Sequence, residues 1–240
     1  MTKLSTRALC TNPEWLGRSD CRNCGVRHMM MFSGLQDSDF DHILEPIDNF
    51  RYAEKTLFYT QGTQDNKVYS IRSGVIKLIQ TQSDGSLRIV RLLGPGALVG
   101  LEALLDQPYR HTAIALRELD VCRISTATLK NLETEKPLLS KKIMAHWEQH
   151  LSFADRWISE LSSGTVRTRT LKLFSFLSEL SGDDSDTIRF FGYEDMASMI
   201  GTSRETFSRI VGELKDEGII SKTDDSQNYR FSINAEQNPD

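Results

Sequence analysis

Apolar and polar positions change their spacing along the 240-residue chain, and each change predicts a different structure. Between residues 35 and 135, β-rich runs separated by glycine turns predict short strands. The clearest runs are Val68–Arg72, Val75–Ile79, Leu87–Leu93 and Val121–Ile124. Regular short strands of this kind predict an antiparallel roll or barrel.

Beyond Pro137 the apolar positions follow a helical spacing of three and four residues. The positions in this seam are Met144, Trp147, Leu151, Ala154, Ile158 and Leu161. A heptad seam predicts a helix that packs on a partner helix, and the simplest partner is the same helix of a second subunit. Asp155 lies beside the seam, where it is expected to face its symmetry mate in a parallel dimer. Packing of the helix on its own domain remains the alternative.

The last third of the chain predicts a second domain, with an amphipathic helix over Val166–Leu180, two short helices from Tyr193 and Ser203, and a terminal β-hairpin. The expected organisation is an arm (1–34), a β-roll (35–135), a dimerisation helix (136–164), a C-terminal domain (165–234) and a tail (235–240).

The two short helices carry the pattern of a helix-turn-helix. Ala197 is small where two helices must cross, Gly201 sits at the turn, and Ser203 can cap the second helix. The predicted DNA-reading residues are Ser203, Arg204, Glu205, Ser208 and Arg209. Arginine pairs with guanine and glutamate accepts from cytosine in the major groove, so this face predicts base readout. A solvated charged face is the alternative.

Composition narrows the class of protein. The formal net charge of −4 excludes a protein coated in basic charge, although DNA binding requires only one locally positive surface. No apolar run approaches the length of a membrane-spanning helix, and the first residues do not form a secretion signal. We therefore expect a cytoplasmic protein. Neither a nucleophile–base pair nor a phosphate-binding loop is present, so an enzyme is not expected.

The four cysteines are unevenly distributed. Cys10, Cys21 and Cys24 lie in the first tenth of the chain, and Cys122 stands alone. In a reducing compartment, clustered cysteines more often bind metal or perform redox chemistry than form structural disulfides. A thiol–disulfide switch and a zinc site are alternatives, with Cys122 then a buried apolar residue.

Taken together, residues 21–234 resemble the CRP/FNR superfamily of bacterial transcription regulators. The resemblance is carried by Phe58–Gly62, Val68–Gly74, Gly96–Gly100 and Ser203–Arg209. It implies an α+β protein with a cyclic-nucleotide-binding-type β-roll, a long dimerisation helix and a C-terminal winged helix-turn-helix. It also implies a homodimer that binds double-stranded DNA and contacts RNA polymerase, the latter through the loop Thr81–Gly85.

Cyclic nucleotide binding is not expected. Cyclic-AMP-binding relatives carry a glutamate after the last glycine of the turn and an Arg-Ser pair further on, where this chain has Leu101 and His111-Thr112. Glu102 and Arg110 are each one step away. In a strand, however, one step places a side chain on the opposite face, so these two residues are not expected to take the family positions.

The stretches Val99–Leu104 and Asp120–Ile124 resemble the oxygen-sensing FNR branch. This resemblance implies a 4Fe–4S cluster that controls dimerisation and DNA binding, held here by Cys10, Cys21, Cys24 and Cys122. Cys10 then replaces a family cysteine whose place falls near Met30. Sensing of haem, nitric oxide or another small effector in the β-roll remains an alternative, as does a thiol switch without a cluster.

Two residues of the predicted reading face bear on the DNA sequence. Ser208 is the residue of the FNR branch, which reads TTGAT-type half-sites, whereas Arg204 is the residue of the CRP branch, which reads TGTGA. The combination predicts an inverted repeat of TTGAT-like half-sites with relaxed preference at the outer position.

Overall fold

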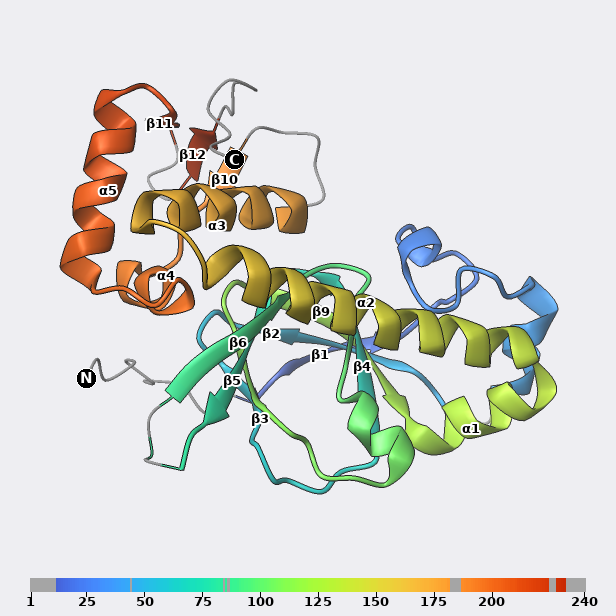
Figure 1. Ribbon diagram of the computed structural model, residues 1–240. Helices are drawn as coiled ribbons and strands as arrows, with labels where there is room; N and C mark the ends of the chain where they lie inside the picture. Colours follow the sequence, from blue (N-terminus) through green and yellow to red (C-terminus); the bar gives the residue numbers. More distant parts are fainter. Residues whose placement is uncertain are drawn as a thin grey trace. The chain divides into compact units, whose positions relative to one another are not determined.

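Two β-sheets build the N-terminal part of the chain in this computed structural model, which describes residues 12–43, 45–83, 85, 87–181, 187–224 and 228–231 (Figure 1). The first sheet has the order β1-β2-β9-β4-β7. Its strands are β1 (Glu14–Arg18), β2 (Asp48–Tyr52), β9 (Leu119–Ser125), β4 (Lys67–Ser73) and β7 (Leu98–Val99). The second sheet has the order β3-β8-β5-β6. Its strands are β3 (Leu57–Tyr59), β8 (Thr112–Ala115), β5 (Ile76–Thr81) and β6 (Leu87–Leu93). Pairs such as β4–β9 and β5–β8 run antiparallel, which confirms the predicted β-domain.

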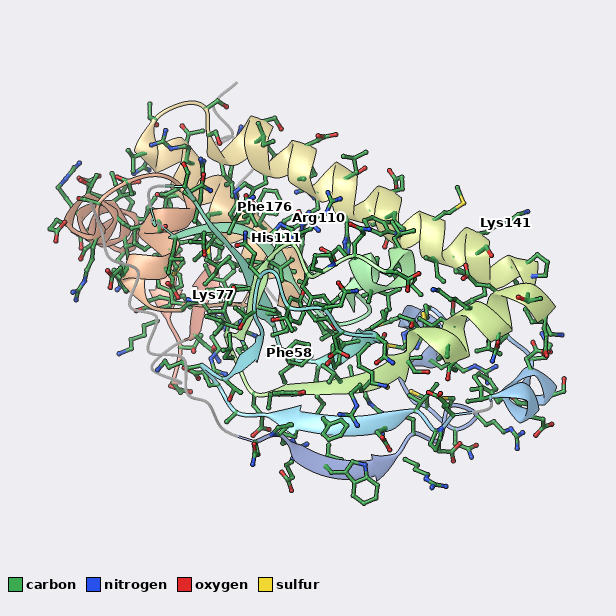
Figure 2. All side chains as sticks on the ribbon, turned by 90° about the horizontal axis from the view of Figure 1, so that it is seen from below. Phe58, Lys77, Arg110, His111, Lys141 and Phe176 are labelled. Atoms are coloured by element: carbon green, nitrogen blue, oxygen red, sulfur yellow. The ribbon has the colours of Figure 1, made fainter. Side chains whose placement is uncertain are left out.

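Apolar side chains of the central strands form the core of this part. Val68 on β4 and Val121 on β9 are completely buried. An aromatic group extends this core around Phe58, which Figure 2 labels. The Phe58 ring lies 4.5 Å from Tyr52 and 4.4 Å from Tyr69 between centroids. Burying a large apolar side chain contributes roughly 1.5–3 kcal/mol, so these contacts fix the positions of β4 and β9.

The described part of the predicted arm over 1–34 is folded and contains a strand that was not predicted. Strand β1 pairs antiparallel with β2, and Trp15 stands opposite Phe50. Met30 and Met31 belong to the core, with 6% and 1% of their surface exposed. The pattern hid β1 because the strand is short, contains a register shift and is largely exposed, so its residues do not alternate.

Two helices follow the sheets. Helix α1 spans Thr126–Glu135 and begins at Ser125, whose Oγ accepts a hydrogen bond from the backbone N–H of Thr128 at 3.1 Å. This helix was not predicted, because the segment was assigned to strands. Helix α2 spans Pro137–Leu161, close to the predicted 136–164, and starts with a proline whose missing N–H is not needed at that position. Among the described residues, no helix is long and apolar enough to cross a membrane.

The chain divides into two structural units within α2, after residue 152. The C-terminal unit contains helices α3 (Val166–Ser181), α4 (Tyr193–Met199) and α5 (Arg204–Asp216). Its strands β10 (Thr187–Arg189), β11 (Ile220–Lys222) and β12 (Asn228–Phe231) form an antiparallel sheet of order β10-β12-β11. The predicted helices and terminal hairpin are confirmed, with β10 as an additional strand.

Candidate functional site

Helices α4 and α5 form the predicted helix-turn-helix. Ala197 is 1% exposed, and Gly201 in the turn has a φ of +64°, which glycine adopts at little cost. Ser203 caps α5, because its Oγ accepts a hydrogen bond from the backbone N–H of Thr206 at 3.2 Å. Local sequence therefore fixes where the second helix begins.

One face of α5 is buried and the other is open to solvent. The buried residues are Phe207, Ile210, Val211 and Leu214. The predicted DNA-reading residues Ser203, Arg204, Glu205, Ser208 and Arg209 are all exposed. The structure thus brings the predicted set together on the solvent side of one helix, and their contact with DNA stays a prediction.

Hydrogen bonds within α5 set the positions of its charged groups. A hydrogen bond from its own backbone N–H and one from the Ser203 hydroxyl lower the pKa of Glu205, so its carboxylate is held at the start of the helix. Arg209 Nη1 donates to Glu213 Oε1 at 2.5 Å. Glu213 was not among the predicted site residues, although its position four residues after Arg209 was the available signal.

Most of the predicted dimerisation seam lies open on α2. The exposed fractions are 69% for Met144, 39% for Trp147, 64% for Leu151 and 65% for Ile158. A row of exposed apolar side chains on one helix is typical of an interaction surface. Ala154 is half-buried and Asp155 is exposed.

The seam ends earlier than predicted, because Leu161 is only 1% exposed. Leu161 therefore belongs to the interior of its own chain and not to the exposed row. The spacing alone could not distinguish a residue of a dimer seam from a residue that packs in its own chain, because both recur every three or four positions along a helix.

Three cysteines from distant parts of the sequence line one small cavity of about 20 Å³. These are Cys21 and Cys24 from the arm and Cys122 from β9, and Met30 lines the same cavity. We call it the sulfur cavity. Cys10, the fourth predicted ligand, lies outside the described residues.

Neighbouring strands hold Cys122 in place. It stands opposite Asn49 on β2 and Ser70 on β4, and its Sγ donates to Asn49 Oδ1 at 3.3 Å. The Ser70 hydroxyl donates to Met30 Sδ at 3.5 Å, which anchors the arm beside the cysteines. Gly96 permits this close approach, because a Cβ there would lie 2.9 Å from the Met29 carbonyl oxygen.

The environment of the sulfur cavity keeps the thiols of Cys21 and Cys122 protonated. Burial, reinforced by the neighbouring cysteines, raises the pKa of Cys21 to about 12. Burial also raises the pKa of Cys122, against the opposing effects of the Ser19 hydroxyl and the Arg72 charge. A thiolate at either position consequently needs a compensating cation, which a bound metal provides.

The donor chemistry of the sulfur cavity fits an iron–sulfur group, since such groups prefer soft thiolates around one small volume. The described residues include no group of three or more His, Cys, Asp or Glu arranged to hold a metal ion. The cavity has room for about one water molecule. A four-iron cluster would therefore have to displace the arm segment that carries Cys21 and Cys24.

We expect Cys21 in the cluster-free protein to react slowly with iodoacetamide. A thiol with a pKa of about 12 is less ionised near neutral pH than an ordinary cysteine, and the thiolate is the reacting form. The labelling rate at pH 8 should be about 100-fold or more below that of the denatured chain, and should rise steadily with pH. Mass spectrometry of peptides measures it, and equal rates in both states would contradict the described burial.

A second, larger cavity of about 290 Å³ lies in the N-terminal unit. Its charged and polar lining includes Arg91, Glu102, Arg110, His111 and His150, together with Trp147. Figure 2 labels Arg110 and His111, which lead into β8. We call this the roll cavity.

One prediction about this region is wrong. Residues Leu101–Leu105 form a 3₁₀ helix and not a strand, so the argument that one step reverses a side chain does not apply. Leu101 and Glu102 both line the roll cavity, as do Arg110 and His111. Glu102 lies 3.8 Å from His111, and although burial alone would raise the pKa of Glu102, hydrogen bonds from His111 and the backbone lower it.

Arg91 and His150 give the roll cavity two unsatisfied donors. Arg91 Nη1 lies 3.1 Å from His150 Nδ1, which makes Nδ1 the acceptor and leaves the proton on Nε2. Within the described part of the chain, neither Arg91 Nε nor His150 Nε2 has a hydrogen-bond partner, and both are buried. Burial and the Arg91 charge lower the pKa of His150 to about 4, so the imidazole is neutral at pH 7.

Comparison with known proteins agrees with both halves of the architecture. Residues 49–135 match the family model described as a cyclic nucleotide-binding domain, and residues 171–234 match a Crp-like helix-turn-helix domain. A protein named cyclic AMP receptor protein from Thermus thermophilus is 30% identical over 192 residues, 79% of this chain and 87% of that protein. The anaerobic regulatory protein of Pasteurella multocida is 26% identical over 206 residues, 84% of this chain and 76% of that protein.

Solved structures share the fold. FixK2 from Bradyrhizobium japonicum superposes with a TM-score of 0.67 at 20% identity, covering 78% of this chain and 93% of that chain. The two family matches and the 30% identical relative define a DNA-binding transcription regulator and not an enzyme. The chain belongs to the CRP/FNR family, whose regulators bind DNA as dimers.

Proposed function

We propose that this regulator senses oxygen or redox state through a 4Fe–4S cluster at the sulfur cavity. The observation that carries the proposal is that Cys21, Cys24 and Cys122 line one cavity although about a hundred residues separate the first two from the third. The names of relatives such as the anaerobic regulatory protein of Pasteurella multocida support an oxygen-linked role.

Cys21, Cys24 and Cys122 would supply three thiolates, and Cys10 is the predicted fourth. When bound, the cluster would supply oxygen-sensitive redox chemistry. Arg72 lies close enough to act on the Cys122 charge and would partly neutralise the thiolates.

The reach of the chain is compatible with Cys10 as a ligand. Strand β1 runs from Glu14 to Arg18. Cys122 pairs with Asn49, and Asn49 pairs with Gly17, so Cys122 lies level with the Arg18 end of β1. Returning from Glu14 to Cys122 requires about 10 Å along β1 and about 10 Å across the intervening strand β2, a direct distance of about 14 Å. The four residues from Cys10 to Glu14 span at most about 14 Å.

The proposal is tested by DNA binding with and without air. Anaerobically reconstituted protein should bind a duplex with an inverted TTGAT repeat about tenfold or more tightly than the same sample after air exposure. Anisotropy titration at fixed salt measures the difference. Equal affinities in the two states would contradict oxygen control of DNA binding.

The finer aspects of DNA recognition form part of the same proposal. Glu205 and Arg209 are four residues apart and would address the two strands of one G·C pair, giving TTGAT-like half-sites about one helical turn apart. RNA polymerase would be contacted through the loop Thr81–Gly85, of which Asp84 lies outside the described residues. We expect a regulator with these roles to act in the cytoplasm.

Asp155 is expected to oppose dimerisation in the cluster-free protein. It is exposed beside Ala154 and the open apolar row, so the two symmetry-related carboxylates would repel each other. Asp155→Ala should strengthen cluster-free dimerisation by about 1 kcal/mol, a value typical of solvent-screened charges at close range. Sedimentation analysis measures the association constant.

Glu160→Gln is the matched control, because Glu160 lies on the same helix but pairs with Arg156 at 3.5 Å. Its association constant should stay close to that of the unaltered protein. A constant unchanged by Asp155→Ala would remove charge repulsion from the mechanism.

A second candidate function is supported by the roll cavity, which would bind a small anionic effector. Arg91 Nε and His150 Nε2 are buried donors that need an acceptor, and an anion satisfies both. Because Trp147 lines the cavity, its fluorescence would report binding. Cyclic AMP and succinate are suitable probes, and Arg91→Met should abolish any binding found. The absence of a response to either probe class in the intact protein would count against this function.

A further inference from the structure

Glu213 forms an ion pair with Arg209, although nothing in the sequence pattern assigned Glu213 a role. Its Oε1 accepts a hydrogen bond from Arg209 Nη1 at 2.5 Å, one helical turn further along α5. The two side chains are 41% and 64% exposed, respectively. This ion pair therefore stands on the open side of the helix, beside the predicted contacts with DNA.

Arg209 has two acidic neighbours at helical spacing and bonds to only one of them. Glu205 lies four residues before it and Glu213 four residues after it. A glutamate that precedes its cation usually makes the better helical pair, which would favour Glu205. Here Arg209 Nη1 donates to Glu213 Oε1 instead, and within the described residues no hydrogen bond or ion pair joins Arg209 to Glu205. Arg209 is paired with Glu213, and the two predicted base-reading groups stay apart.

We propose that Glu213 is a positioning residue for sequence readout, holding the Arg209 guanidinium away from Glu205 so that each group remains available to its own base. The guanidinium has five N–H donors, so a bond through Nη1 leaves Nε and Nη2 for guanine. Without Glu213, Arg209 pairs with Glu205, and neither side chain is then available to hydrogen-bond its base. This inference rests on the proposed reading of a G·C pair by Glu205 and Arg209.

The charge of Glu213 gives the proposal a distinctive signature. A carboxylate on the DNA-facing side repels phosphates and weakens binding to every sequence. Glu213→Gln removes that repulsion, so binding to unrelated DNA tightens, while discrimination at the G·C pair falls. A loss of folding would weaken both together.

The test compares Glu213→Gln with Asp216→Asn, which removes the same charge from an exposed position three residues further along α5. Dissociation constants are measured at fixed salt for the inverted TTGAT repeat and for duplexes with the G·C pair replaced. Glu213→Gln should reduce the ratio of mismatched to matched dissociation constants about fivefold or more, part of what one bidentate arginine–guanine pair contributes. Asp216→Asn should leave that ratio unchanged.

A Glu213→Gln protein whose affinities shift by one common factor on all duplexes, as in Asp216→Asn, would overturn the proposal. Arg209→Ala distinguishes a failure of the proposed base reading from a failure of the proposed role of Glu213. If Arg209→Ala leaves discrimination intact, the proposed base reading itself fails. If Arg209→Ala lowers discrimination and Glu213→Gln does not, only the role of Glu213 fails.

Discussion

Cys122→Ser is expected to abolish cluster assembly and, with it, anaerobic DNA binding above the cluster-free level. Cys122 is the only cysteine that the β-roll contributes to the sulfur cavity, and a serine hydroxyl is a poor ligand for iron of this kind. Serine preserves the local fold, because its hydroxyl can donate to Asn49 Oδ1 as the thiol does at 3.3 Å. Iron and sulfide assays after anaerobic reconstitution measure occupancy, and anisotropy measures a loss of DNA affinity of about tenfold or more.

The same assays are applied to variants of the other three cysteines and of one neighbouring methionine. Cys10→Ser, Cys21→Ser and Cys24→Ser are each expected to lose the cluster as well. Met30→Leu is the matched control, because Met30 lines the same cavity with a sulfur that is not a thiolate. Wild-type iron content in Cys10→Ser would remove Cys10 from the ligand set. Full occupancy in Cys122→Ser would contradict the arrangement altogether.

Arg209→Ala is expected to have the second largest effect, a loss of about 1–3 kcal/mol in binding to TTGAT-like sites with relaxed choice at the G·C pair. Arg209 is exposed on α5 and keeps free donors for guanine beyond its bond to Glu213. Competition binding across half-site variants at fixed salt measures the discrimination, since the phosphate contribution is then constant.

Arg204→Ala is the companion variant on the same helix face. It should weaken TGTGA half-sites while leaving TTGA half-sites nearly unchanged, because Arg204 is the residue of the CRP branch. Equal losses from both variants on every duplex would mean that Arg204 and Arg209 contact only phosphate. The assignment of the reading face would then be wrong.

The sequence predicted elements whose signals are local. Glycine turns delimited β4, β5 and β6, and the cap at Ser203 with the turn at Gly201 defined α5. Strand β1 and helix α1 were missed for physical reasons. β1 is short, irregular and exposed, so its place is decided by pairing with β2, a contact between distant segments.

The candidate sites were predicted in chemistry but not in geometry. Cysteine count and spacing drew attention to Cys21, Cys24 and Cys122, whereas only the fold could bring β9 and the arm to one cavity. The roll cavity was misjudged because Leu101–Leu105 was treated as a strand, and Arg91 and His150 have no common motif in the sequence. Leu161 followed the heptad spacing and is nevertheless buried.

Anaerobic purification followed by an absorption spectrum and by iron and sulfide assays shows whether the sulfur cavity holds a 4Fe–4S cluster. We expect a broad visible absorption that bleaches in air, with about four iron and about four sulfide per chain. Protein that stays colourless after anaerobic reconstitution, with its thiols free or bound to zinc, would contradict the proposed cluster.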